Sequence, residues 1–498
     1  MRKLLKTLCA LGTLCFFSVL STAEEVKILY ISSLPEIIKN KHDFSLAQIA
    51  TAVREERAKS DNIIFVHGGA SLGPSILGAM DNGAHMIDVL NILEPDVMGV
   101  GKREFSYKED QFSLHAQSAM FPFISSNIQL KEGQTPIVGL EPYYVIDTLA
   151  HSIGFMAVTS ENVIDEYGSY KLEALPLENS IKKTADQLRS EGAEYVVLMA
   201  DTDYDDLSTY TADGTVDLIL YAHNIGNPYS VDTGVEKLSK GMLDGQLITI
   251  NVDLDNPEGK KASIELSDIA SFEEDPEIKS IVESYGARLN ILFRQQLGTT
   301  DTAMNTERNT VRTGENAFGN FVTDSIRNAM KADIAFINSG GIRGNTRYPA
   351  GTILTREHIQ SELPFNNTVQ LFEITGEQIQ GALEHGLSCL DETDGCFLQV
   401  SNIQMEYNSK APSGQRVINV LIGGQPLETG KTYTAATLNF LANGGDGFKM
   451  LQNMPKKTNL LSGKLLWEVV ANQLEEQQTI APKLENRLND QATGSSAS

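Results

Sequence analysis

Short apolar runs alternate with amphipathic segments along the first half of the chain, and this alternation constrains the fold more than any other feature. Residues 27–32 and 62–66 are apolar enough for buried strands, and residues 45–59 between them carry apolar side chains at helical spacing. Further apolar runs follow at residues 94–100, 122–128, 153–158, 195–199 and 216–221. Strands that alternate with helices predict an α/β sheet whose functional site lies at the strand ends.

A long amphipathic helix is predicted over residues 275–298, because apolar side chains recur along one of its faces. The helix follows an acidic stretch and is the best candidate for a domain boundary. A second α/β unit follows it, and a polar segment, which we expect to be frayed, ends the chain. We therefore predict a leader (1–23), an N-terminal domain (24–271), a linker helix (272–299), a C-terminal domain (300–480) and a polar tail (481–498).

The first residues have the pattern of a secretory signal peptide. Arg2, Lys3 and Lys6 form a basic start, residues 8–20 are mostly apolar, and small residues at 21–23 offer a cleavage site. The apolar stretch is shorter than the roughly 20 residues that a membrane span needs, which leaves a membrane anchor as the weaker alternative. We expect a periplasmic or secreted protein with no membrane contact after cleavage.

The charge balance restricts the partners of the chain. The formal net charge is −25 over 498 residues. Nucleic acids and anionic membranes require clustered positive charge, so the balance argues against both. A small anionic ligand stays possible, because a few arginines can form a local positive site.

Two of the four cysteines belong to the leader, and the other two, Cys389 and Cys396, lie close together in a loop. In an oxidising compartment this spacing favours a local disulfide. A metal site is disfavoured, because no second Cys or His pair lies nearby at ligand spacing.

Four motifs in the second half carry residue types that suit a nucleotide site. They are ERNTVR (307–312), NSGGIR (338–343), LPFNN (363–367) and FLANGGDGF (440–448). In this order they resemble the C-terminal domain of the 5′-nucleotidase family, over most of residues 300–455. Each motif alone would also suit an ordinary core phenylalanine, a glycine turn or a solvated arginine face.

The resemblance implies a nucleoside or nucleotide as the small-molecule partner. The matching residues are Arg308, Arg312, Asn338, Arg343, Phe365, Asn367, Phe440 and Asp446. In the family the two phenylalanines stack on the base, the aspartate accepts from the ribose, the asparagines contact the nucleoside and the arginines face the nucleotide. The chemistry fits these roles, because every base has a π-face and guanidinium groups hold phosphate by paired hydrogen bonds.

The N-terminal half resembles the calcineurin-like metallophosphoesterase domain of the same family, but only as a scaffold. The resemblance implies a four-layer α/β sandwich for this half and an α/β nucleotide-binding domain for the C-terminal half. In the family, two divalent metal ions at the strand ends activate water. Where the family has Asp-x-His, this chain has Ser33 and Pro35, and Gly69 stands where the family's bridging aspartate does. Lys102 and Arg103 replace a metal-binding asparagine and the catalytic histidine.

Two further metal-ligand motifs of the family are also incomplete in this chain. The strand at 195–199 runs into Ala200 instead of a histidine, and of the Gly-His-x-His motif only His223 remains. Ser106 replaces the aspartate of the catalytic dyad. The sequence therefore predicts no metal cofactor, no catalytic residue and a loss or strong impairment of phosphoester hydrolysis.

Three alternatives stay open. Lys102 and Arg103 are candidates for binding a nucleotide phosphate without cleaving it, unless the site has simply drifted. A one-metal site from His42, His67 and His223 would give an active nucleotide phosphohydrolase with an atypical centre. An interaction protein with a vestigial pocket is the third. The favoured interpretation is a nucleotide-binding pseudoenzyme of the family.

Overall fold

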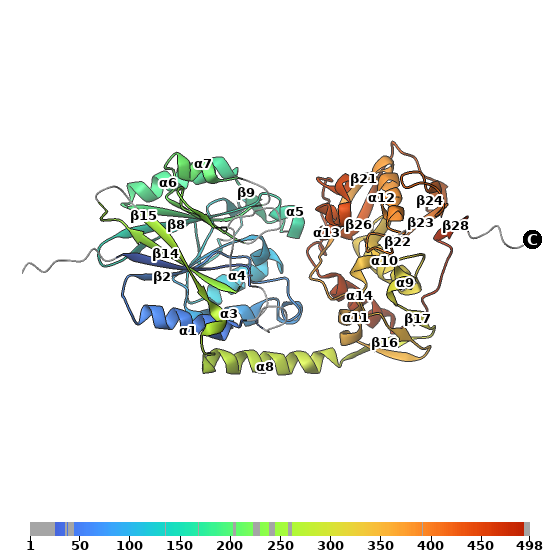
Figure 1. Cartoon of the computed structure of the whole chain (residues 1–498), viewed down its shortest axis with the longest axis horizontal. Helices are drawn as coiled ribbons and strands as arrows, with labels where there is room; N and C mark the ends of the chain where they lie inside the picture. The colour runs from blue at the N-terminus through green and yellow to red at the C-terminus, as the bar shows by residue number, and fades with distance from the viewer. Residues whose placement is uncertain are drawn as a thin grey trace, which may run out of the picture.

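The structure is a computed structural model that describes residues 25–34, 37, 44–134, 136–167, 169–202, 206–222, 230–238, 245–256, 261–390 and 392–492. The predicted leader lies outside this range. Two α/β regions lie side by side, and helix α8 (Pro276–Phe293) connects them (Figure 1). Among the described residues, none of the helices combines the length and the apolar character that crossing a membrane requires.

Two sheets form the centre of the N-terminal region. The first has the order β15-β14-β1-β2-β3-β4-β6 and the second the order β13-β12-β11-β10-β8-β7. The strands of the first are β1 (Val26–Ile31), β2 (Ile63–His67), β3 (Val97–Gly99), β4 (Phe123–Ile124), β6 (Leu140–Glu141), β14 (Gln246–Asp253) and β15 (Lys261–Asp268). Those of the second are β7 (Tyr143–Asp147), β8 (Ser152–Thr159), β10 (Tyr195–Asp201), β11 (Leu218–Tyr221), β12 (Val231–Asp232) and β13 (Lys237–Leu238).

The side chains of each central strand alternate between two cores. In β1, Ile28 and Tyr30 belong to the core between the sheets, whereas Leu29 and Ile31 belong to the core shared with helices α1 (Leu46–Arg57) and α3 (Ala84–Leu93). Helix α6 (Leu177–Ser190) covers the outer face of the second sheet. Because the central strands of both sheets are buried on both faces, the region has four layers, as predicted.

The boundaries of several predicted elements differ from the structure. The predicted strand 122–128 is divided between β4 and β5 (Ile128–Leu130), and β10 continues two residues past 199 to Asp201. Helix α8 begins at Pro276, where the Asp275 side chain accepts the N–H groups of Glu277 and Ile278. It ends at Phe293 instead of residue 298, because the residues that follow form β16 (Gln296–Thr300), which pairs with β20 (Thr352–Thr355).

The C-terminal region is built around a four-stranded sheet with the order β21-β26-β18-β22. Its strands are β21 (Val369–Thr375), β26 (Thr432–Leu438), β18 (Ile334–Asn338) and β22 (Leu398–Ser401). Helix α10 (Ala317–Met330) packs on this sheet, and helix α12 (Gly376–Ser388) contributes to a second core. Strands β18 and β26 are parallel, so their carboxyl ends lie at the same edge.

The prediction of a frayed tail from residue 481 is wrong for its first part. Strand β28 (Leu488–Asp490) pairs in parallel with β23 (Ile403–Tyr407). The Arg487 side chain is buried, and its NH1 and NH2 groups bind the Asp324 carboxylate at 2.9 and 2.6 Å. An ion pair between residues far apart in sequence leaves no local pattern, which is why polarity alone was misleading. Residues 493–498 lie outside the described range.

Candidate functional site

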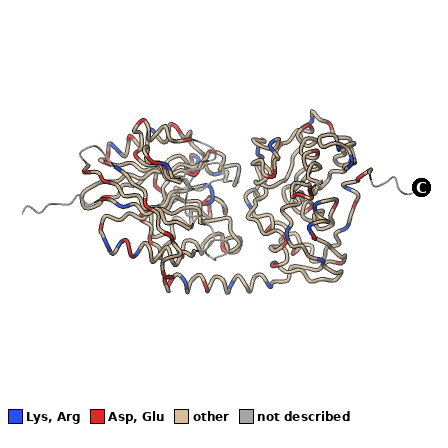
Figure 2. The backbone as a smooth tube through the Cα atoms, in the orientation of Figure 1, with Lys and Arg blue, Asp and Glu red and all other residues tan. Residues whose placement is uncertain are grey.

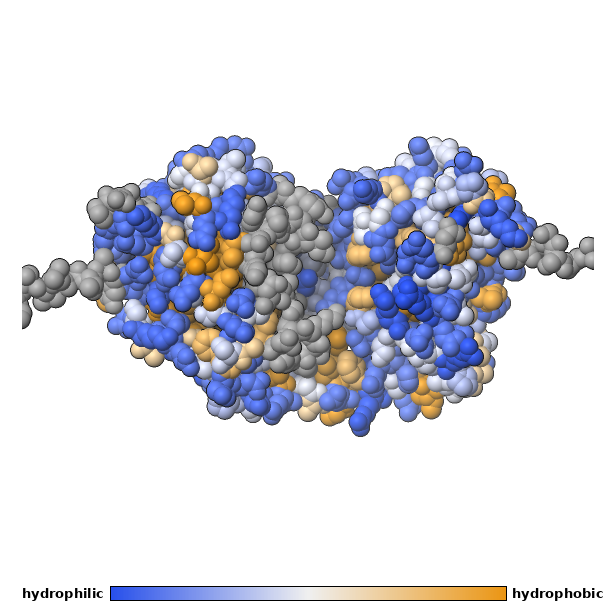
Figure 3. All heavy atoms as spheres, in the orientation of Figure 1, coloured by the Kyte–Doolittle hydropathy of each residue, from blue (hydrophilic) through white to orange (hydrophobic). Residues whose placement is uncertain are grey.

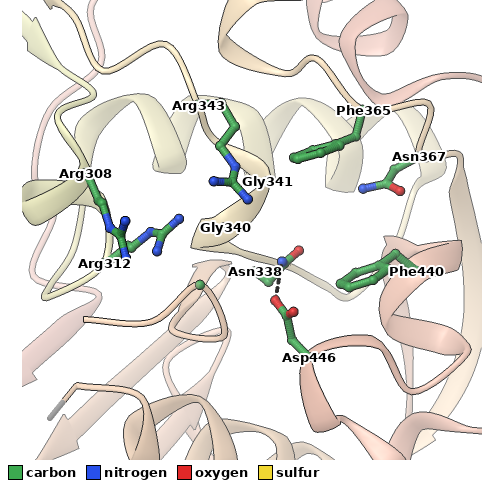
Figure 4. A pocket seen from close by; sticks show the side chains of 11 residues that line it. Arg308, Arg312, Asn338, Gly340, Gly341, Arg343, Phe365, Asn367, Phe440 and Asp446 are labelled. Carbon is green, nitrogen blue, oxygen red and sulfur yellow. Dashed lines mark hydrogen bonds between the residues drawn. The ribbon is translucent and has the colours of Figure 1, made fainter. Parts of the chain in front are cut away.

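A cavity of about 310 Å³ in the C-terminal region is lined by all eight residues that the sequence analysis selected for a nucleotide (Figure 4). Gly340, Gly341 and Gly395 complete its lining. The first two glycines belong to the NSGGIR motif. Gly395 comes from the loop between the two cysteines, and the sequence analysis missed it.

Parallel strand ends bring distant motifs to this cavity. Asn338 ends β18, and Phe440 lies in α13 (Asn439–Ala442), directly after the neighbouring parallel strand β26. Loops at the carboxyl ends of parallel strands meet at one edge of the sheet, which is where ligands bind in open α/β folds. The remaining motifs reach the same edge from α9 (Arg308–Val311) and from the loop after α11 (Arg356–Glu362).

An aromatic pair forms one side of the cavity. Figure 4 shows Phe365 and Phe440 on the same side, with Asn367 between them. Gly445 permits a close approach of the next loop, because a Cβ at this position would lie 2.6 Å from atoms of the Phe440 ring. Two rings of this kind can hold a flat base, and an amide beside them can both donate to and accept from the base edge.

A polar pair lies in the middle of the cavity. Asn338 Nδ2 donates to the Asp446 carboxylate at 2.7 Å, while Asn338 Oδ1 is buried without a hydrogen-bond partner among the described residues. The Asp446 carbonyl accepts from His385 Nε2 at 2.8 Å, which fixes the loop that presents the carboxylate. Nothing in the sequence around His385, 61 residues away, indicates this role. The pair offers a carboxylate and a free amide oxygen to hydroxyl groups of a ligand.

Three arginines give the cavity its positive charge: Figure 4 shows Arg308 and Arg312 opposite the phenylalanines, and Arg343 between these two arginines and Phe365. Arg312 is buried, and its Nε has no hydrogen-bond partner among the described residues. Burial lowers the pKa of Arg312, and the like charges of Arg308 and Arg343 lower it further. The Arg343 guanidinium carbon lies 5.2 Å from the centre of the Phe365 ring, in cation–π contact. Like charges held together in this way favour an anionic ligand.

Glu362, a second residue that the sequence analysis missed, shapes the loop that carries Arg343. Its carboxylate is 1% exposed and accepts from the Tyr348 hydroxyl at 2.7 Å, the Thr306 hydroxyl at 2.8 Å and the Gly344 N–H at 3.1 Å. Burial raises the pKa of Glu362, while these three hydrogen bonds lower it. No local pattern singles this glutamate out among the many acidic residues of the chain.

Comparisons with known proteins agree with this geometry. Residues 296–453 match the model of the 5′-nucleotidase C-terminal domain. Human 5′-nucleotidase is 25% identical over 492 residues, which cover 89% of this chain and 85% of that protein. The venom 5′-nucleotidase of Naja atra is 26% identical over 491 residues, covering 89% of this chain and 92% of the venom protein. The chain is thus similar to 5′-nucleotidases over most of its length, and residues 296–453 match the model of their C-terminal domain.

The similarity extends over both regions of the chain. The trifunctional nucleotide phosphoesterase of Bacillus subtilis is 24% identical over 500 residues, although the chain spans only 34% of its length. A putative 5′-nucleotidase from Staphylococcus aureus superposes with a TM-score of 0.67 at 15% identity, over 94% of this chain and all of that one. NAD nucleotidase from Haemophilus influenzae gives 0.66 at 16% identity, over 94% and 99%. The two-domain fold of these structures is therefore the fold of this chain.

The described residues at the family's metal positions do not fit a two-metal centre. Gly69 has φ +84°, and a Cβ there would lie 2.5 Å from the Gly99 oxygen and 2.8 Å from the Gly101 nitrogen. An aspartate at residue 69 therefore requires a shift of the backbone. Lys102 brings an ammonium group, which repels divalent cations. No group of three or more His, Cys, Asp or Glu with metal-binding geometry is found within the described part of the chain.

Glu104 joins the loop after β2 to the loop after β3 in this part of the structure. Its Oε1 accepts the N–H groups of Ser71 and Leu72 at 2.8 and 3.2 Å, and its Oε2 accepts those of Ala70 and Gly101 at 2.8 and 2.7 Å. The side chain is 1% exposed, and burial raises the pKa of its carboxyl while the four N–H groups lower it. The two loops are thus joined by one carboxylate of the chain.

Asp201 is a further carboxylate at the strand ends that the sequence analysis did not select. Its Oδ2 accepts the backbone N–H of Lys102 at 2.7 Å, and it is 4% exposed. The sequence signal was present, since an apolar strand ends in this aspartate, but the strand was predicted to end too early. In this position Asp201 holds the loop that carries Lys102.

The histidines of the alternative metal site are only partly described. His67 is buried, its Nδ1 accepts the Gly69 N–H at 3.0 Å, and burial lowers its pKa to about 3. His42 and His223, the one retained ligand position, lie outside the described residues, as does Pro35. Lys102 is buried in η1 (Lys102–Phe105) and Arg103 is half-buried; neither lines the C-terminal cavity.

Proposed function

We propose that this chain is a member of the 5′-nucleotidase family that binds a nucleoside or nucleotide in its C-terminal cavity and has lost metal-dependent hydrolysis. The observation that carries the proposal is the joint lining of one cavity by Arg308, Arg312, Asn338, Arg343, Phe365, Asn367, Phe440 and Asp446. A base between the rings, a ribose at the Asn338–Asp446 pair and an anion at the arginines would satisfy every part of this cavity.

The arginine side favours a nucleotide over a nucleoside. Arg312 Nε and Asn338 Oδ1 are buried atoms that lack partners within the described residues. Buried polar atoms normally have hydrogen-bond partners, so we expect a bound ligand to supply them here. A nucleoside can satisfy the amide oxygen, but only a phosphate also offsets the charge of three arginines.

Loss of hydrolysis is supported by the poor fit of Gly69 and Lys102 to metal ligands. No step of metal-assisted water attack can be assigned to the described residues. The opposite proposal, an active phosphohydrolase, is supported by the names of the relatives, which are nucleotidases and a nucleotide phosphoesterase.

Export is a separate part of the proposal. It rests on the signal-peptide pattern of residues 1–23, followed by a chain in which acidic residues are spread over both regions (Figure 2). Apolar side chains form small groups among hydrophilic ones on the face shown in Figure 3. An extracytoplasmic binding protein for nucleotides would act in capture or sensing of its ligand. Detection of the chain after osmotic shock, with the first residue near position 24, tests this part.

Titration calorimetry with AMP and adenosine tests nucleotide binding. The wild type is expected to bind both ligands, and AMP more tightly. Phe440→Ala is expected to weaken both by about tenfold or more, because base stacking contributes roughly 1–3 kcal/mol. Ile418→Ala, at an exposed side chain outside the cavity lining, serves as the matched control. Absence of binding by the wild type would refute the proposal and favour an interaction protein with a vestigial pocket.

A further inference from the structure

The segment between Cys389 and Cys396 forms one wall of the cavity, although neither cysteine lines it. The two cysteines form a disulfide, with their Cα atoms 5.9 Å apart. Gly395 lines the cavity, and its carbonyl accepts the Gly340 N–H at 2.8 Å. The Ser339 hydroxyl donates to the same carbonyl at 3.2 Å. The cross-linked segment is therefore hydrogen-bonded to the NSGGIR loop that carries part of the site.

The same segment orients Arg312. The NH1 group of Arg312 donates to the Thr393 carbonyl at 3.3 Å. The like charges of Arg308 and Arg343 repel the Arg312 guanidinium, so a hydrogen-bond acceptor is needed to keep it in this position. Thr393 has φ +56°, a conformation that a β-branched residue adopts only when its surroundings impose it. The carbonyl thus points at the guanidinium because the segment is constrained.

The segment also lies close to Asp446. A Cβ at Gly395 would lie 3.0 Å from the Gly340 Cα and 3.6 Å from an Asp446 carboxylate oxygen. The backbone of residue 395 is therefore packed against Gly340 and lies close to the Asn338–Asp446 pair. A displacement of this segment would therefore disturb the packing at both places.

Each cysteine is anchored in a different element. Cys389 caps the end of α12, and Cys396 is 4% exposed in the core that contains Phe397 and Leu398. The disulfide closes the segment between these two fixed points. It limits the conformations that Thr393 and Gly395 can adopt in the free protein. Ligand binding therefore costs less conformational entropy.

We propose that the Cys389–Cys396 disulfide is a positioning element of the cavity and makes the binding of phosphorylated ligands depend on the oxidation of these cysteines. The inference rests on the proposed nucleotide site. A dithiol reductant opens the bond: each sulfur gains one electron and one proton, and the dithiol becomes a disulfide. Thr393 and Gly395 then gain freedom, and Arg312 loses its fixed acceptor.

Calorimetry on the full-length chain, with and without dithiothreitol, tests the inference with AMP and adenosine as probes. Reduction is expected to weaken AMP binding by about tenfold or more and adenosine binding by less than about threefold, because the lost contact involves a charged group at the arginine side. In an Arg312→Lys variant, which cannot make the same contact, reduction is expected to change AMP affinity by less than about threefold.

The outcomes separate the two proposals. If the oxidised protein binds neither probe, the nucleotide site itself is refuted. If it binds both and reduction leaves the AMP to adenosine ratio unchanged, or changes it equally in the Arg312→Lys variant, the positioning role is refuted. If circular dichroism shows that the reduced chain unfolds, Gly395→Ala in the oxidised protein decides. This variant displaces the wall with the disulfide intact, and unchanged AMP affinity would overturn the inference.

Discussion

The substitution Glu104→Gln tests whether the loops at the family's metal positions are held by a carboxylate of the chain. Each oxygen of Glu104 accepts two backbone N–H groups. A glutamine keeps one oxygen, and its NH₂ group then faces two N–H donors. Two buried N–H groups lose their acceptors at about 1–3 kcal/mol each, so the expected destabilisation is about 2–6 kcal/mol.

Urea unfolding followed by circular dichroism measures this loss, with Glu132→Gln at an exposed position as the control. Trp467, the single tryptophan, lies in helix α14 (Leu466–Gln477) of the C-terminal region and reports separately on that region. Hydrogen exchange is expected to accelerate at the amides of residues 70–72 and 101. A Gln variant within about 0.5 kcal/mol of the wild type would show that Glu104 does not hold these loops.

Acid and charge variants give two further predictions. The unfolded chain protonates His67 near pH 6.5, whereas burial lowers the folded-state pKa to about 3. As the pH falls from about 6.5 to about 3, the free energy of unfolding should therefore fall by about 1.4 kcal/mol per pH unit because of His67. His67→Asn should flatten this dependence of stability on pH, and identical slopes in both proteins would contradict the burial argument. If Lys102 and Arg103 bind a phosphate, alanine at both should weaken AMP more than adenosine in calorimetry, and an equal effect on both ligands would exclude that role.

The candidate site was predictable because each motif carries its own chemistry. Paired arginines, an aromatic followed by asparagines, and a glycine-rich turn with an aspartate are local patterns, and parallel strands bring them together. His385, Glu362 and Gly395 act through hydrogen bonds or packing across long sequence distances, so no window of the sequence contains their partners. The roles of these three residues become apparent only in the folded structure.

The same distinction explains the fold. Alternating apolar runs predicted the layers, since the side-chain period of a strand is local. Boundaries were less predictable, as the end of α8 and the extension of β10 to Asp201 show. Residues 296–300 pair with β20 instead of continuing the helix, and β10 extends to Asp201 because its pairing with β8 continues as far as Thr159. The residues around Arg487 are held in a defined structure by an ion pair with Asp324, which the polar composition of this segment could not indicate.

The central claim is that the positions of Gly69 and Lys102 no longer support a two-metal centre while the C-terminal cavity still binds its ligand. Elemental analysis of the chain after incubation with Mn²⁺ and Zn²⁺, together with phosphate release from AMP, tests it most directly. We predict well under one bound ion per chain and no phosphate release, in a sample that binds AMP. Two tightly bound ions per chain with rapid, chelator-sensitive release of phosphate would contradict the account.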